Sequence, residues 1–166
     1  MQPDSVIAFD ETLAAGLCQP AIQHPQPSDQ PRRFVSFFLG ENQFALPAEA
    51  VEEVTIPLVP TPLPDGPPAL SGIAHLRGEI VAVVDLGEKP AAVSGEKRRS
   101  IILRSLDPSV EMPIGFNVDR AGEIVQIRIE EIGYSDSVDS IAPFEAIVGG
   151  RKIRIVETSR LSALLI

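Results

Sequence analysis

The segment of residues 64–86 constrains the fold of this chain more than any other part of the sequence. It begins with a proline-rich turn, continues through a short apolar stretch, and ends in a nearly pure apolar stretch. Between the two apolar pieces stands one cation followed by a turn glycine, Arg77-Gly78. Two segments that both favour burial, separated by such a turn, predict a β-hairpin of residues 73–76 and 79–85. An arginine at this position either stabilises the hairpin or presents its charge to a partner.

Short strand-like runs recur from residue 32 onward, separated by Gly, Pro and polar residues. The prolines of residues 57–68 exclude a central strand or a long helix there, and this segment is a connection or, formally, a polyproline ligand. Many short strands with almost no helix predict a barrel or paired barrels, since closure removes exposed strand edges. Further strands are predicted at residues 34–39, 43–46, 51–54, 100–106, 112–119, 123–132, 146–149 and 152–157.

Two short helical pieces interrupt the strands. Pro47 begins one predicted helical turn of residues 47–50, because proline suits the first position of a helix. The chain closes with a short apolar helix, for which Thr158 or Ser159 is a suitable N-cap.

Residues 1–31 differ in composition from the rest of the chain. An apolar stretch around Phe9 and Leu13 indicates a short amphipathic helix, and residues 19–31 are rich in Pro, Gln and Ser, as in an extended linker. This extension is either disordered or a peptide that docks on a protein surface. We therefore predict an N-terminal extension, 1–31, and one folded domain, 32–166.

Charge and composition exclude several classes of function. The formal net charge of −9 opposes binding to nucleic acid and to anionic lipid. The single cysteine, Cys18, forms no intrachain disulfide, and no apolar run reaches the roughly 18–20 residues that span a bilayer. The N-terminus is acidic, unlike a secretory signal. We expect a cytoplasmic protein with no nucleic-acid partner and no direct membrane insertion.

Signals for catalysis, metals or cofactors are weak. His24 and His75 have no Cys or His neighbour at metal-ligand spacing, and neither a nucleophile elbow nor a phosphate-binding loop is present. Asp85 and Asp119 each end an apolar strand, where a carboxylate commonly caps a turn. We expect no catalytic residue, metal or cofactor. A ligand-binding or catalytic barrel built around His75, Asp85 and Asp119 stays open as an alternative.

Two adjacent glutamates, Glu52 and Glu53, stand between Val51 and Val54. Alternate residues of an extended segment face opposite sides, so only one glutamate is expected to share a face with Val51. A glutamate on this short strand is a suitable partner for Arg77. The alternative is that both glutamates are solvated surface charges. An exposed ion pair contributes only about 0–1 kcal/mol to the free energy of unfolding.

The order of these pieces resembles the CheW-like family, the coupling proteins of bacterial chemotaxis arrays. The resemblance implies an all-β fold with a short C-terminal helix, built as two intertwined five-stranded SH3-like barrels without enzymatic activity. It also implies two partners, the cytoplasmic tip of a chemoreceptor and the regulatory domain of a CheA-type histidine kinase, which has the same fold. The matching segments are residues 34–47, 51–55, 64–86, 115–125 and 160–165.

The family pattern also suggests which residues bind partners. An apolar groove between the barrels is expected to take one face of a receptor helix. A second face near the predicted Glu53–Arg77 pair is expected to bind the kinase. The candidate residues are Val51, Val54 and Ile80 for the groove, and Glu53, Arg77 and Gly78 for the second face.

Three departures from the family pattern concern the partner. His75 stands where the family usually has Asn, Ala82 where Pro is frequent, and the loop 87–99 lacks an arginine that often follows the Asp-Leu step. A scaffold of a pilus or gliding-motility array therefore stays open as an alternative.

Overall fold

The computed structural model describes residues 30–87, 95–104, 112–136 and 141–166. Within these limits, Pro31–Ile166 forms one compact unit. The amphipathic helix and the linker expected in the N-terminal extension lie outside the described residues. The boundary at residue 31 stays a prediction.

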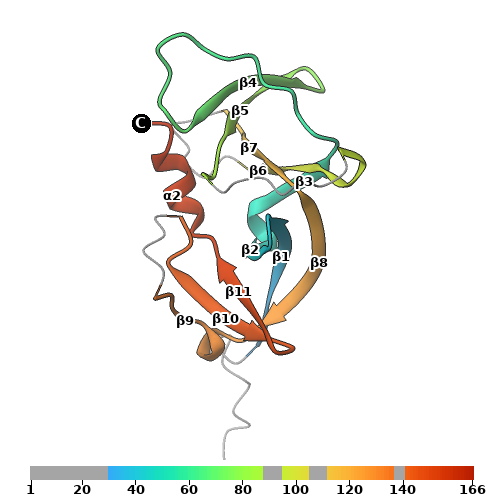
Figure 1. Cartoon of the computed structure of the whole chain (residues 1–166), viewed down its shortest axis with the longest axis vertical. Helices are drawn as coiled ribbons and strands as arrows, with labels where there is room; N and C mark the ends of the chain where they lie inside the picture. Colours follow the sequence, from blue (N-terminus) through green and yellow to red (C-terminus); the bar gives the residue numbers. More distant parts are fainter. Residues whose placement is uncertain (1–29, 88–94, 105–111, 137–140) are drawn as a thin grey trace, which may run out of the picture. The chain divides into compact units, whose positions relative to one another are not determined.

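The described residues form two β-sheets and one short helix, α2 (Thr158–Ala163) (Figure 1). Short 3₁₀ turns are η2 (Ala48–Ala50), η3 (Gly95–Lys97) and η4 (Ile129–Glu131). Sheet A has the order β8 (Arg120–Ile127), β1 (Arg32–Leu39), β2 (Asn42–Pro47), β11 (Arg151–Ile155), β10 (Phe144–Val148) and β9 (Gly133–Tyr134). Sheet B has the order β3 (Val51–Thr55), β6 (Arg99–Leu103), β7 (Ile114–Val118), β5 (Glu79–Val84) and β4 (Leu70–Leu76).

The two sheets are intertwined along the chain. Strands β1 and β2 belong to sheet A, β3 to β7 form sheet B, and β8 to β11 return to sheet A. Parallel pairings of β11 with β2 and of β5 with β7 complete the sheets. The expected all-β fold with a short C-terminal helix is confirmed; sheet B has the five strands expected of each barrel, and sheet A has a sixth, the two-residue strand β9.

Apolar side chains form three buried clusters. One lies inside sheet A around Phe34 and Ile153, and one lies inside sheet B around Leu58 and Val81. The third, which we call the central cluster, joins both sheets and α2 through residues such as Phe37, Phe116 and Leu161. Consecutive residues of β2 and β6 therefore point into different clusters. Burial on both faces explains why these strands are continuously apolar instead of alternating.

The C-terminal helix begins differently from the expectation. Neither Thr158 nor Ser159 is the N-cap, because Glu157 occupies that position. The reason is that Val156 and Glu157 are still held in extended conformation by tertiary contacts: their N–H groups donate to the carbonyls of Ala45 and Ile141, at 2.8 and 2.9 Å. The helix starts only after these bonds are made.

The proline-dense segment lies against β4, as a connection and not as a strand of the sheet. Thr61 and Ile73 exchange backbone hydrogen bonds of 2.8 and 3.0 Å. Gly72 allows this approach, since its φ is +143° and a Cβ there would stand 2.1 Å from the Thr61 carbonyl oxygen. The close approach positions residues 57–60 at the edge of the site described next.

Candidate partner-binding site

The predicted hairpin is present, and Arg77 occupies a demanding position in it. Strands β4 and β5 pair from Leu76 and Glu79 outward, so Arg77 and Gly78 are the two central turn residues. Their φ angles are 50° and 88°. Positive φ at both positions is the pattern of a type I′ turn, which strongly prefers Asn-Gly or Gly-Gly. An arginine there is unusual and carries backbone strain.

The expected ion pair is formed by this arginine. Its Nη1 atom lies 2.8 Å from Oε2 of Glu53, and the two side chains are 77% and 23% exposed. The second glutamate oxygen, Oε1, is buried and has no hydrogen-bond partner among the described residues. Glu53 is on β3 and Arg77 is in the β4–β5 turn, at opposite edges of sheet B. The ion pair therefore joins the two edges of the curled sheet.

A β-bulge changes which residues of β3 share a face. Val51 pairs with Leu103 and Val54 with Ile101, whereas Glu53 pairs with Ile102. The extra residue puts both valines on one face. Glu52 and Glu53 both line a small pocket of about 80 Å³ that includes Arg77. The expectation that one glutamate shares a face with Val51 is therefore wrong, because simple alternation does not hold across a bulge.

The structure does not bring the three apolar candidates together in one groove. Val51 is partly buried against the central cluster, while Val54 and Ile80 are 42% and 46% exposed. Val54 is on β3 and Ile80 is on β5, with β6 and β7 between them in the sheet. Ile80 follows the Arg77 turn in sequence, and neither it nor Val51 or Val54 lines the pockets described in this section.

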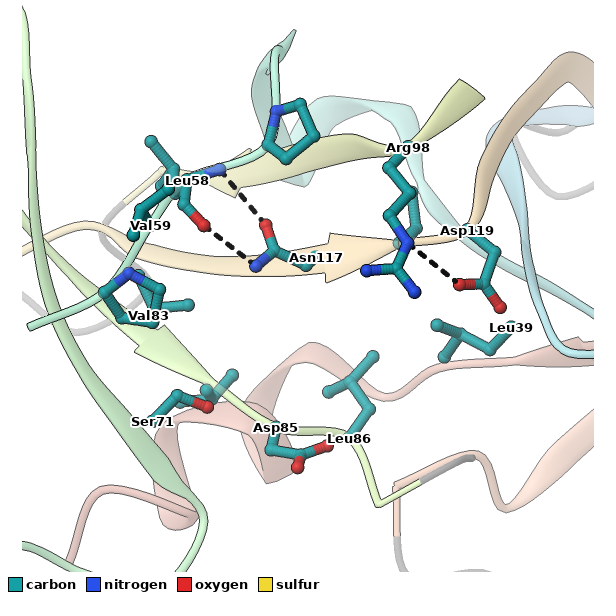
Figure 2. Close-up of a pocket in the computed structure, with 14 residues that line it drawn as sticks. Leu39, Leu58, Val59, Ser71, Val83, Asp85, Leu86, Arg98, Asn117 and Asp119 are labelled. Carbon is teal, nitrogen blue, oxygen red and sulfur yellow. Dashed lines mark hydrogen bonds and ion pairs between the residues drawn. The ribbon is translucent and has the colours of Figure 1, made fainter. Parts of the chain in front are cut away.

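A larger pocket lies between the sheets, and we call it the inter-sheet pocket (Figure 2). Its volume is about 430 Å³, and its walls come from β1, β5, β7 and the proline-dense segment. Leu39, Val59 and Leu86 supply apolar surface. Val59 is 86% exposed, which leaves its side chain available to a partner.

Asn117 on β7 positions one wall of this pocket. Its Nδ2 donates to the Leu58 carbonyl at 3.0 Å, and its Oδ1 accepts from the Leu58 N–H at 3.2 Å (Figure 2). The hydroxyl of Ser100 accepts from the same N–H at 2.8 Å and also donates to Asn117 Oδ1. These bonds place the start of the proline-dense segment over sheet B.

The two carboxylates of the inter-sheet pocket make hydrogen bonds that stabilise turns of the fold. Asp119 joins β7 to β8, and its carboxylate accepts from the Gly40 N–H at 2.7 Å, with Arg98 Nε at 3.9 Å from Oδ1. Asp85 accepts from the Gly87 N–H at 2.9 Å. Both acids thus make the turn contacts expected of them.

The alternative of a catalytic site built on three residues is not supported. Asp85 and Asp119 line the inter-sheet pocket, but His75 lines a different pocket beside Ile56 and Thr61. Among the described residues, no group of three or more His, Cys, Asp or Glu is placed to hold a metal ion. In the same part of the chain, no helix is long and apolar enough to cross a bilayer.

Sequence reasoning missed most of the inter-sheet pocket. Asn117 is one polar residue in an apolar strand, and nothing local shows that it faces the Leu58 backbone. Arg98 stands in a basic run that reads as a solvated loop. One signal was present: Val59 is an apolar residue in a segment whose prolines exclude a central strand, and it lines the pocket.

Comparison with known proteins identifies the family whose sequence pattern and fold this chain shares. The profile of the CheW-like domain matches residues 33–163. The chemotaxis protein CheW of Rhizobium meliloti is 27% identical over 133 residues, which cover 76% of this chain and 84% of that protein. The chemotaxis protein CheW of Helicobacter pylori is 26% identical over 103 residues, and the match spans 60% of each chain.

A solved structure shares the fold. The crystal structure of the scaffolding protein TtCheW from Thermoanaerobacter tengcongensis has a TM-score of 0.65 and 27% identity, covering 76% of this chain and 89% of that one. The profile match spans nearly all of the described residues, and both sheets and the terminal helix lie within it or at its end. The chain therefore belongs to the CheW-like domain family.

Proposed function

We propose that this protein is a non-enzymatic adaptor that couples chemoreceptors to a CheA-type histidine kinase. The observation that carries the proposal is the family match over residues 33–163. The solved relative is named a scaffolding protein, and two sequence relatives are named chemotaxis proteins. Such a role requires a rigid body with two separate docking faces. We also propose that the protein is located in the cytoplasm.

The first proposed face contains Arg77, Gly78 and Glu53 and binds the kinase regulatory domain. A non-glycine residue at positive φ costs about 1 kcal/mol or more, and an exposed ion pair returns only about 0–1 kcal/mol. Fold stability alone therefore does not account for an arginine at this turn. The exposed guanidinium, which Glu53 orients, provides a hydrogen-bond donor for a partner. Ile80 adds nearby apolar surface.

The second proposed face is the inter-sheet pocket with its apolar rim, and it binds the receptor tip. A pocket of about 430 Å³ accommodates a few side chains, as when a helix inserts its apolar residues into a groove. Val59 and Leu39 line it, and on β3 Val54 adds exposed apolar surface while Val51 is partly buried against the central cluster. The chemistry of this face suits an amphipathic helix with apolar residues one turn apart.

Separate titrations of the full chain with the two partners test the adaptor role. Isothermal calorimetry with a kinase regulatory domain and with a receptor tip fragment is expected to show saturable binding to each. Modest interfaces predict affinities in the micromolar range, as for reversible signalling contacts. A folded sample that binds neither fragment contradicts the proposal.

A further inference from the structure

The outer edge of strand β4 is paired over only part of its length. Leu76 and Glu79 flank a two-residue turn, so they form a hydrogen-bonded pair, and alternate residues of β4 bond to β5. The backbone N–H and C=O groups of Ile73 and His75 therefore point away from β5. Ile73 uses both groups in its bridge to Thr61, at 2.8 and 3.0 Å. The backbone groups of His75 have no such partner among the described residues.

The proline-dense segment does not extend this pairing to His75. Antiparallel continuation of the bridge would place Val59 opposite His75. The residue before it, Leu58, is held over β7 instead, because its C=O accepts from Asn117 Nδ2 at 3.0 Å and its N–H donates to Asn117 Oδ1 at 3.2 Å. The Leu58 side chain is also buried in the apolar cluster inside sheet B. The segment therefore leaves β4 after one bridge, and the edge at His75 stays open.

A pocket of about 560 Å³ lies against this open edge, and we call it the edge pocket. The four consecutive residues 73–76 of β4 line it. Because alternate residues of a strand face opposite sides, a pocket that contacts all four lies beside the strand and not over one of its faces. Ile56 and Val59 also line the pocket, and they are 73% and 86% exposed. Natural proteins commonly protect an open edge with charged side chains, whereas exposed apolar side chains flank this one.

We propose that the edge pocket binds an extended segment of a partner protein, which adds a strand to β4 at His75 and continues the antiparallel pairing that the Thr61 bridge begins. The backbone of that segment accepts from the His75 N–H and donates to the His75 C=O, and its aliphatic side chains contact Ile56 and Val59.

Complementarity of backbone dipoles selects this occupant over a helix. A helix uses its N–H and C=O groups internally, so a helix that covered the edge would leave both backbone groups of His75 without a partner. Covering a donor and an acceptor without pairing them is unfavourable, because both lose their hydrogen bonds to water. The proposal concerns the edge of sheet B and does not depend on the adaptor role.

A nuclear magnetic resonance titration of the full chain tests this proposal. The probe is the uncharged peptide acetyl-Thr-Val-Thr-Val-Thr-amide, and the matched probe carries methyl groups on the backbone nitrogens of its three central residues. We expect saturable shift changes at residues 56–59 and 73–76, with slower hydrogen exchange of the His75 amide. The methylated peptide keeps every side chain but is expected to bind about fivefold more weakly or worse, since it leaves the covered His75 C=O without a donor.

A matched pair of variants tests the same hydrogen bonds from the protein side. His75→Pro removes the outward N–H but no hydrogen bond of the β4–β5 ladder, and proline is tolerated at such an edge position. It is expected to weaken binding of the unmethylated peptide about fivefold or more. His75→Ala keeps the N–H and removes only an exposed side chain, so we expect a change within about twofold.

Four results overturn the proposal. They are the absence of saturable shift changes at the edge pocket, equal binding of the two peptides, equal effects of His75→Pro and His75→Ala, and a dimer of this chain that His75→Pro dissociates. The last result, measured by sedimentation, would identify a second copy of the chain as the occupant. The comparison of the two peptides uses the unmodified chain, so it stands even where His75→Pro fails to fold.

Discussion

Replacing Leu161 with alanine is expected to lower the free energy of unfolding by about 2–5 kcal/mol. Leu161 is fully buried in the central cluster, where it contacts the apolar residues that join the two sheets. A helix as short as α2 has no stability of its own in water. Its docking therefore depends on this leucine and on Leu164 and Leu165, which pack against the same cluster. Urea unfolding followed by circular dichroism measures the change.

Two further variants separate this effect from a general sensitivity of the C-terminus. Ile166→Ala is the matched control, because Ile166 is fully exposed and its truncation is expected to change stability by less than about 0.5 kcal/mol. Deletion of residues 161–166 is expected to cost at least as much as Leu161→Ala. A loss below about 1 kcal/mol for Leu161→Ala would show that α2 is not part of the core.

Replacing Arg77 with asparagine is expected to separate binding from stability. Asparagine tolerates positive φ and is preferred at this turn position, so relief of strain offsets the lost ion pair. Stability should then stay within about 1 kcal/mol of the wild type. Binding to the kinase regulatory domain should fall about 30-fold or more, as expected when a hydrogen-bonded interface charge is removed. Thermal melts and calorimetric titration give the two values.

Arg128→Asn is the control for this experiment. Arg128 is an exposed arginine whose Nη1 lies 3.8 Å from Oε1 of Glu130. It follows β8, a strand of sheet A, and directly precedes η4, whereas Arg77 belongs to sheet B. Its replacement should leave kinase binding unchanged. If Arg77→Asn instead lowers stability by more than about 2 kcal/mol with unchanged binding, then Arg77 serves the fold and not a partner.

Local sequence patterns were sufficient for the strands and for the Arg77 hairpin. Runs of apolar residues and turn glycines predict these elements because the conformation of a strand or a tight turn depends mainly on residues that are close in sequence. The Glu53–Arg77 pair was also predictable, since a buried-strand glutamate and a turn arginine have complementary charges. The β-bulge on β3 was not, because it depends on how β3 pairs with β6 and not on the β3 sequence.

The inter-sheet pocket could not be predicted for a related reason. Leu39, Leu58 and Asn117 come from distant parts of the chain, and only the packing of both sheets brings them together. Arg120 and Arg154 meet neighbouring aromatic rings through strand pairing alone. Side chains that converge by tertiary structure leave no spacing pattern in a single sequence. The helix N-cap was misassigned for the same cause, since tertiary hydrogen bonds to Val156 and Glu157 delay the helix start.

The central claim is that this chain connects a receptor to a kinase, and a bridging measurement tests it most directly. A tagged receptor tip fragment is immobilised, and retention of the kinase regulatory domain is measured with and without the full chain. The account predicts that the kinase domain is retained only when this chain is present, and that Arg77→Asn abolishes retention while the chain itself stays bound to the receptor fragment. Retention of the kinase domain at the same level without this chain, or no retention with it, would contradict the account.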